Sequence, residues 1–218
     1  MSLDFTVVPA FLGTIAIGGL WTIVITLLSA AISLAGGIGF ALILLYGHPL
    51  IRLPVRFVVF LFMGTPLLLQ LFMIYYGLSQ LGVNLPAFWT GVAGLGLHYA
   101  VYNADIIKAT IRNVDVGQSE AARTLGFGRI ATLRYFVVPQ ALLNAVPQLG
   151  NNMIILLKDS ALLSVLGITE LVLASQLAIS RTFRPFEFYI TAAAFYYVIN
   201  LAMEFALRWV AAKTEEIR

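Results

Sequence analysis

The chain has 218 residues, of which 61% are hydrophobic and only 11% are charged, and its mean hydropathy is +0.95. An ordinary soluble domain has about 45–50% apolar and about 25% charged residues, so a water-soluble fold could not bury this much apolar surface. The net charge of +3 is typical of basic residues placed beside membrane helices and does not indicate nucleic-acid binding. Because there is no cysteine, a disulfide, a thiolate metal site and a cysteine nucleophile are excluded.

The first apolar run predicts one transmembrane helix. No formally charged residue occurs between Asp4 and Arg52, and a crossing needs about 20 apolar residues, so we expect a tilted crossing over 13–46. Within it Ala31, Ala35 and Gly39 recur at every fourth position. Such a stripe of small residues predicts close packing against another helix.

The remaining apolar runs predict four more crossings, which makes the chain a single all-α transmembrane domain over residues 1–218. An uncharged stretch with one turn-like break at 81–86 favours crossings over 57–81 and 87–111. Pro139 suits the first turn of a fourth crossing over 139–158, and the last crossing is expected over 186–210, where Glu204 and Arg208 are spaced to pair. The apolar but interrupted segment 160–182 predicts a re-entrant or interfacial element.

The distribution of basic residues predicts the orientation. Five crossings place ten basic residues on one side and only Arg181 and Arg184 on the other. The ten are Arg52, Arg56, Lys108, Arg112, Arg123, Arg129, Arg134, Arg208, Lys213 and Arg218. By the positive-inside rule the N-terminus is expected outside and the C-terminus in the cytoplasm.

Residues 105–135 are the one substantial polar stretch and must lie outside the hydrocarbon. A short cytoplasmic helix is expected here, over about 117–126, with Ser119 as its N-cap and Gly126 suited to the left-handed position at its end. By composition alone, this segment would be a connecting loop with a helical turn.

This stretch resembles the glutamate-alanine-alanine loop of ATP-binding-cassette importer permeases. Glu120-Ala121-Ala122 and Gly126 match that loop, and the segment ending at Pro139 falls at the family's spacing, with Phe and Val replacing Ile and Leu. The similarity extends to Gly64-Thr65-Pro66 and to Lys158-Asp159-Ser160, and is closest to the polar amino acid uptake branch (histidine-, glutamine- and arginine-type permeases).

The resemblance implies a type I importer permease in a bacterial inner membrane, with a coupling helix that docks into a separate ATPase. The residues implied for that contact are Gly117, Glu120, Ala121, Ala122, Leu125 and Gly126. The implied partners are ATPase subunits, a second permease subunit and a solute-binding protein. The sequence contains no Gly-rich phosphate loop, so ATP and Mg²⁺ are expected on the partner, and this chain is expected to be neither an enzyme nor a cofactor-binding protein.

A polar face on the helix after Pro139 indicates where a substrate could pass. Gln140, Asn144, Gln148 and either Asn151 or Asn152 recur at spacings of three or four and form a face that points toward Asp159. Taken singly, each amide also fits a hydrogen bond between neighbouring helices, and Lys158-Asp159 also fits an interfacial ion pair. The resemblance implies a substrate site made of Gly64, Thr65, Gln70, Asn152, Lys158, Asp159 and Ser160.

Two further residues bear on that site. Many relatives carry Arg where this chain has Met63, so either a second permease supplies the carboxylate site or the substrate is not an ordinary α-amino acid. His98 is expected to be a buried histidine with its hydrogen bonds satisfied, and no metal site is predicted, because His48 lies in a different loop.

The alternative function is a self-contained channel or secondary transporter, which would need no docking helix.

Overall fold

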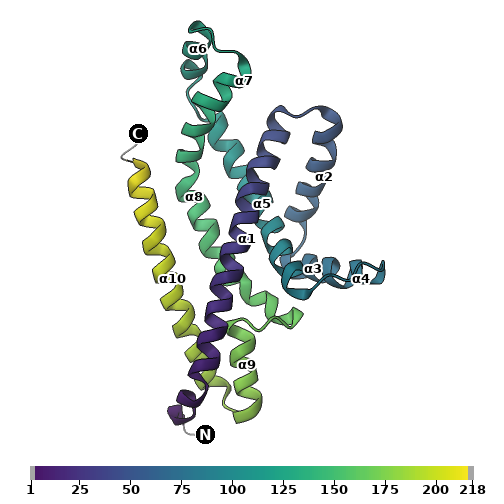
Figure 1. Ribbon diagram of the computed structural model, residues 1–218, viewed down its shortest axis with the longest axis vertical. Coiled ribbons are helices and arrows are strands. Elements are labelled where there is room, and N and C mark those ends of the chain that lie inside the picture. The colour runs from purple at the N-terminus through teal and green to yellow at the C-terminus, as the bar shows by residue number, and fades with distance from the viewer. Residues whose placement is uncertain (1–2, 216–218) are drawn as a thin grey trace.

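The long apolar runs fold into helices that lie along one direction and form an elongated bundle (Figure 1). The computed structural model describes residues 3–215, and within this range no strand occurs. The longer helices are α1 (Leu12–Tyr46), α2 (Pro49–Gly64), α5 (Ala87–Arg112), α8 (Val138–Asp159), α9 (Leu171–Thr182) and α10 (Pro185–Glu215). The shorter elements are η1 (Phe5–Phe11), α3 (Leu67–Phe72), η2 (Met73–Gly77), α4 (Leu78–Gln80), α6 (Val116–Thr124), α7 (Arg129–Thr132), η3 (Leu133–Val137) and η4 (Ser160–Leu166).

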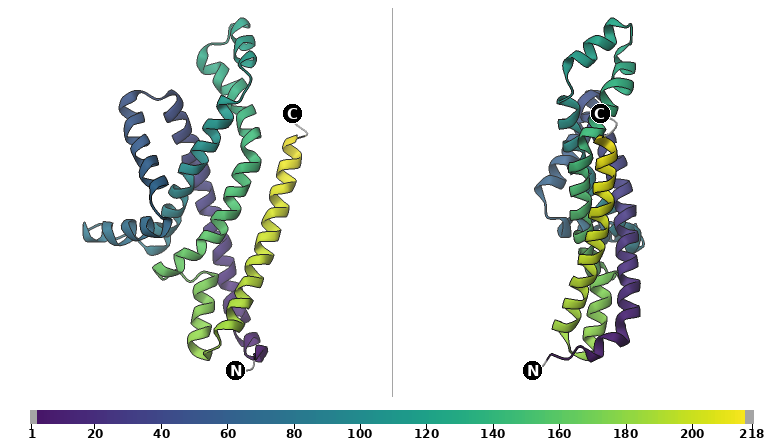
Figure 2. Two further views of the ribbon diagram at one scale, coloured as in Figure 1. Left: turned by 180° about the vertical axis from the view of Figure 1, so that it is seen from behind. Right: turned by 90° about the vertical axis from the view of Figure 1, so that its left-hand side faces the viewer.

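The two ends of the bundle carry different elements. The N-terminal η1 and helix α9 lie at one end, whereas α6 and α7 lie at the other, toward which α10 runs (Figures 1 and 2). Helix α2 stands beside one half of α1, and α3 and α4 project sideways near mid-height. Arg218, one of the ten basic residues counted above, is outside the described residues.

Three helical stretches of the described chain are long and apolar enough to cross a membrane: Phe5–Tyr46, Arg129–Leu166 and Pro185–Lys213. The bent pair α2 and α3–α4 passes the same test as one broken span. Helix α5 is less apolar because it carries residues such as His98 and Asn103, yet most of its side chains are buried between α1, α3 and α8. Among the described residues three spans, or four with the bent pair, pass this test, and α5 is a further long helix between them, which agrees approximately with the expected five crossings.

The expected crossing over 57–81 is wrong as a single helix. The chain bends by 120° between α2 and α3, at Thr65 and Pro66. Proline has no N–H to donate and disfavours a helical conformation in the residue before it, and Thr65 is accordingly extended (φ −127°, ψ 145°). The Thr65 hydroxyl donates to the Leu61 carbonyl at 2.7 Å, which satisfies one of the last acceptors of α2.

The fourth crossing begins earlier than expected. Helix starts at Arg129, not at Pro139, and runs through α7, η3 and α8 to Asp159. One turn of π-helix, Leu133–Val137, ends two residues before Pro139. A π-turn changes which carbonyls need a donor, so the proline can sit inside a continuous helix.

Close helix packing uses glycines other than those in the predicted stripe. A Cβ on Gly37 would lie 2.7 Å from the Asn103 Cβ, and a Cβ on Gly18 would lie 2.7 Å from the Ala174 Cβ. These glycines let α1 approach α5 and α9. By contrast Ala31 and Ala35 are exposed, and a Cβ on Gly39 would meet nothing within 4 Å, so the stripe is not used inside this chain.

Segment 160–182 forms η4 and α9, and the buried carboxylate of Glu170 caps the start of α9. It accepts hydrogen bonds of 2.9 Å from the Val172 and Leu173 amides and from the Tyr196 hydroxyl on α10. The predicted pair in α10 is confirmed, since Arg208 Nη2 lies 2.6 Å from Glu204 Oε1.

At the same end, the start of the chain is attached to α10. The Asp4 amide donates to Glu187 Oε1 at 3.0 Å, and Arg184 lies within ion-pair distance of both carboxylates. Hydrogen bonds from the Thr6 hydroxyl and amide lower the pKa of Asp4.

Candidate functional site

The broken span places Gln70 against the central helix. The Gln70 amide nitrogen lies 2.8 Å from the Phe62 carbonyl and 2.9 Å from both the carbonyl and the hydroxyl oxygens of Thr65. Its carbonyl oxygen lies 2.8 Å from His98 Nδ1. Because that oxygen can only accept, Nδ1 is the donor, and His98 is the buried, satisfied histidine that the sequence predicts.

The neighbouring residue on α5 reaches the end of α8. The Tyr99 hydroxyl donates to Asp159 Oδ2 at 2.7 Å, and the rings of His98, Tyr99 and Tyr102 lie within 6.4 Å of one another. The alternative in which Lys158 and Asp159 form an ion pair is not observed, because Lys158 is exposed and pairs with no acid among residues 3–215. Asp159 therefore keeps one carboxylate oxygen without a protein donor in the described structure.

A second set of polar contacts lies one helical turn away from Tyr99. Asn152 Nδ2 lies 3.0 Å from Asn103 Oδ1, and Asn103 Nδ2 lies 3.2 Å from the Ser33 hydroxyl. Tyr99 and these three residues line a groove of about 380 Å³ between α1, α5, α8 and α10, whose walls are otherwise apolar. Sequence reasoning missed Asn103 and Ser33; the signal for Asn103 is an amide four residues after Tyr99 in an apolar helix.

The other two predicted site residues, Gly64 and Ser160, differ in their exposure. Gly64 is exposed and borders open space, since a Cβ there would meet nothing within 4 Å. Ser160 is fully buried, and its hydroxyl donates to the Leu157 carbonyl at 2.7 Å, so it does not lie beside the carboxylate of Asp159 as a second open ligand. Thr65, Gln70, Tyr99 and Asp159 form the contiguous candidate site, and Asn152 lies next to it.

Helix α6 has well-defined caps at both ends. Its N-cap is Asp115, not the expected Ser119, because the Asp115 carboxylate accepts from the Gly117 amide at 2.7 Å. A Cβ on Gly117 would lie 3.0 Å from that same oxygen, which explains the glycine. At the other end the Gly126 amide donates to the Arg123 carbonyl and the Phe127 amide to the Ala122 carbonyl, which is a Schellman motif with Gly126 left-handed (φ +87°).

The two faces of α6 differ. Glu120, Ala121 and Leu125 are exposed, whereas Ala122 is buried against its own chain. The resemblance implies that Ala122 contacts the ATPase, but its side chain is covered in this structure. Gln140 Nε2 lies 3.1 Å from Gln118 Oε1, and this hydrogen bond connects α6 with α8. The rings of Phe127 and Phe136 meet edge to face at 4.9 Å and fix the exit from α6.

Metal coordination is not indicated in the described part of the chain, where no three His, Asp or Glu side chains group together.

Comparison with known proteins agrees with this arrangement. The model of the family "Binding-protein-dependent transport system inner membrane component" matches residues 32–216. The octopine transport system permease OccM of Rhizobium radiobacter is 36% identical over 88% of this chain and 84% of its own length. The arginine transport system permease ArtQ of Bacillus subtilis is 36% identical over 94% of both chains.

Solved structures give the same result. A crystal structure of an amino acid ABC transporter with histidines has 38% sequence identity and a TM-score of 0.90 over 98% of this chain and 100% of that one. The inward-facing MetNI methionine ABC transporter shares the fold, with a TM-score of 0.76 at 18% identity over 92% of this chain and 96% of that one. The chain therefore belongs to the family of inner-membrane components of binding-protein-dependent transport systems and is a multi-pass permease subunit of an ABC importer.

Proposed function

We propose that this chain forms half of the path for a polar amino acid or a related compound, and that α6 couples this path to ATP hydrolysis on a separate subunit. Two relatives are named as permeases for octopine and for arginine, both of which carry an amino-acid ammonium or its derivative. The full transporter would contain a second permease, two ATPase subunits that hold ATP and Mg²⁺, and an external solute-binding protein. On this proposal the chain itself catalyses no reaction.

The observation that carries the proposal is the continuous helix between the two candidate regions. From Arg129 to Asp159 the helical backbone is unbroken, with Gln118 of α6 hydrogen-bonded to Gln140 in its first half and Tyr99 hydrogen-bonded to Asp159 at its end. A rigid segment of this kind transmits a displacement, so a movement of α6 would shift Asp159 relative to α5. The exposed face of Glu120, Ala121 and Leu125 would be the surface that enters a groove on the ATPase.

The orientation proposed for this mechanism has α6 and the C-terminus in the cytoplasm and the N-terminus outside. Its support is the positive-inside rule: most of the basic residues belong to the α1–α2 turn, the α6–α7 region and the end of α10, all toward one end of the bundle (Figure 2). Arg181 and Arg184 follow α9 at the opposite end.

We propose that the substrate ammonium binds the open oxygen of Asp159, beside the aromatic rings of Tyr99 and Tyr102. A carboxylate and aromatic faces are the groups that recognise an alkylammonium. Gly64 and Thr65 would form the opposite wall, held in place by Gln70. Since Met63 supplies no cation for a carboxylate, that group would be bound by the second permease or be absent from the substrate.

Uptake by the purified transporter in proteoliposomes tests this function. Glu120→Lys reverses a charge on the exposed face of α6, and Leu125→Ser replaces an apolar side chain there by a polar one. Both are expected to abolish ATP-dependent uptake of amino acids while the protein stays monodisperse. Arg134→Gln, a change in the exposed part of the same cytoplasmic region, is the control and is expected to retain uptake. A self-contained channel or secondary transporter would tolerate all three changes.

A further inference from the structure

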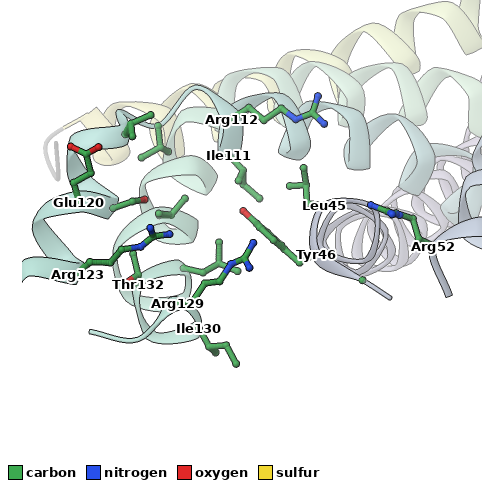
Figure 3. A pocket seen from close by; sticks show the side chains of 16 residues that line it. Leu45, Tyr46, Arg52, Ile111, Arg112, Glu120, Arg123, Arg129, Ile130 and Thr132 are labelled. Carbon is green, nitrogen blue, oxygen red and sulfur yellow. The ribbon is translucent and has the colours of Figure 1, made fainter. Parts of the chain in front are cut away.

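A cavity of about 720 Å³ lies between α6 and the turn that joins α1 to α2 (Figure 3). Its walls come from the ends of α1, α2 and α5, from α6, and from the start of the long helix. It lies at the opposite end of α8 from Asp159 and shares no lining residue with the groove described above. It is therefore a separate site from the proposed substrate path.

The lining is strongly basic. Arg52, Arg112, Arg123 and Arg129 line the cavity together with only one carboxylate, Glu120. Arg52 points toward Tyr46 from α2 and Arg129 points toward it from the other side, whereas Arg123 lies beside Thr132 on the same wall as Arg129 (Figure 3). The Glu120 carboxylate points away from Tyr46. None of the four arginines forms an ion pair with another residue in the range 3–215.

Because four arginines and only one carboxylate line this cavity, its lining favours an anion. Guanidinium groups bind phosphate oxygens with two parallel hydrogen bonds, and a phosphodiester headgroup offers two unesterified oxygens that can accept them from opposite sides of the cavity. The Tyr46 hydroxyl, which points into the same space, adds one more donor.

The rest of the lining indicates that the phosphate belongs to a lipid. Leu45, Ile111, Leu133 and Val137 give the cavity apolar walls, and Tyr46 is the last residue of a candidate membrane span, where tyrosine is typical of the membrane–water interface. Beside Arg52, the side chains of Leu50, Ile51 and Leu53 on α2 are exposed. An apolar surface next to a basic cavity at this depth fits acyl chains below a charged headgroup.

We infer that this cavity binds the headgroup phosphate of an anionic phospholipid, such as phosphatidylglycerol, in the cytoplasmic leaflet. The leaflet follows from the orientation proposed above. The bound headgroup joins α6 to the α1–α2 turn, which the described chain itself leaves without a salt bridge between them. Basic pockets between transmembrane helices on the cytoplasmic side are a known way of holding such headgroups.

Native mass spectrometry of the complete transporter in detergent tests the inference, with phosphatidylglycerol and phosphatidylcholine titrated separately. The double variant Arg123→Gln/Arg129→Gln is expected to weaken phosphatidylglycerol binding by about 10-fold or more, because each basic residue contributes separately to the attraction. The matched control, Arg56→Gln/Arg134→Gln, removes the same charge from residues that do not line the cavity and is expected to bind as the wild type does.

Several results would overturn the inference. Equal weakening in the control pair would mean a general charge effect, and equal binding of phosphatidylcholine would mean no headgroup recognition. Displacement of phosphatidylglycerol by millimolar inorganic phosphate would indicate a site for a free anion. Loss of the ATPase subunits from the double variant with unchanged lipid binding would assign the arginines to a protein contact. The measurement needs neither ATP nor substrate, so its failure leaves the proposed transport function standing.

Discussion

Tyr99 on α5 and Asp159 at the end of α8 are joined by a hydrogen bond of 2.7 Å, although 60 residues separate them in the chain. This contact connects the most buried helix of the bundle with the helix that begins beside α6. If Asp159 is the ammonium ligand, the tyrosine holds the carboxylate in position while one oxygen stays open. The pair is therefore the point at which a movement of the long helix would change the affinity for substrate.

Removing the charge of the Asp159 carboxylate distinguishes binding of the substrate ammonium from a purely structural role of this residue. Asp159→Asn is expected to lower the rate of amino-acid uptake at subsaturating substrate by about 100-fold, because a charged hydrogen bond to the ammonium is lost. Tyr99→Phe keeps the charge and is expected to cost about 5- to 10-fold. Ser164→Ala, whose hydroxyl bonds only to its own helix in the described structure, is the control and should not change uptake. Wild-type uptake by Asp159→Asn would remove Asp159 from the substrate site.

The left-handed conformation of Gly126 predicts a position-specific effect of alanine. An L-residue at φ +87° is strained by about 1–2 kcal/mol, so Gly126→Ala is expected to loosen the end of α6 and to reduce ATP-dependent uptake several-fold. Gly128→Ala is the matched control, because Gly128 has φ −67° and a Cβ would meet nothing within 4 Å at either position. Uptake measured in parallel for both variants checks the prediction; similar losses would show that conformation at Gly126 is not the cause.

Packing between α1 and α5 predicts a difference between two glycines on α1. Gly37→Ala places a methyl group 2.7 Å from the Asn103 Cβ and is expected to destabilise the protein by about 1–3 kcal/mol, seen as a shorter half-life on heating in detergent. Gly39→Ala meets open space and should leave thermal stability unchanged or slightly raised. If Gly39→Ala keeps its stability but loses assembly with the second permease, the exposed stripe of Ala31, Ala35 and Gly39 is a contact between subunits. Equal thermal stability of both variants would contradict the observed packing.

The absence of native cysteine makes the orientation directly measurable. In vesicles that contain the permease without ATPase subunits, Ala121→Cys on α6 should react with a membrane-impermeant maleimide only when the vesicles are inside-out, and Ser180→Cys on α9 only when they are right-side-out, because both positions are exposed in the chain itself. The reverse pattern would place α6 outside the cell and remove its contact with a cytoplasmic ATPase.

The sequence predicts the fold well where a pattern depends on local chemistry. The absence of charge between Asp4 and Arg52 is enough to predict α1, and Gly126 predicts the left-handed end of α6, because both signals act within one turn or one helix. Long-range packing is not visible in this way. The glycines that contact other helices, Gly18 and Gly37, have no local feature that distinguishes them from the exposed stripe.

Prolines were the main source of error in the predicted helices. Pro66 ends α2 and bends the chain by 120°, whereas Pro139 lies within a continuous helix that a π-turn accommodates. Both prolines lie within largely apolar segments, and the choice between a break and a bulge depends on tertiary packing. Ser119 and Asp115 are likewise both good N-cap residues, and in the structure it is the Asp115 carboxylate that accepts from the Gly117 amide at the start of α6.

For the candidate site, the sequence predicts individual residues better than their partners. Asp159 and Gln70 follow from the family resemblance, but their contacts with Tyr99 and His98 depend on how α5 lies against α3 and α8. The basic cavity could not be predicted from the sequence either, because Arg52, Arg112 and Arg129 come from three separate segments that only the fold brings together.

The most direct test of the coupling mechanism is a comparison of solute uptake by proteoliposomes that contain this permease with and without its ATPase subunits. The proposed mechanism predicts uptake only when the ATPase and internal ATP are both present, and its loss when Glu120 is replaced by Lys in an otherwise assembled complex. Uptake by the permease alone, or undiminished ATP-driven uptake by the Glu120→Lys complex, would contradict it.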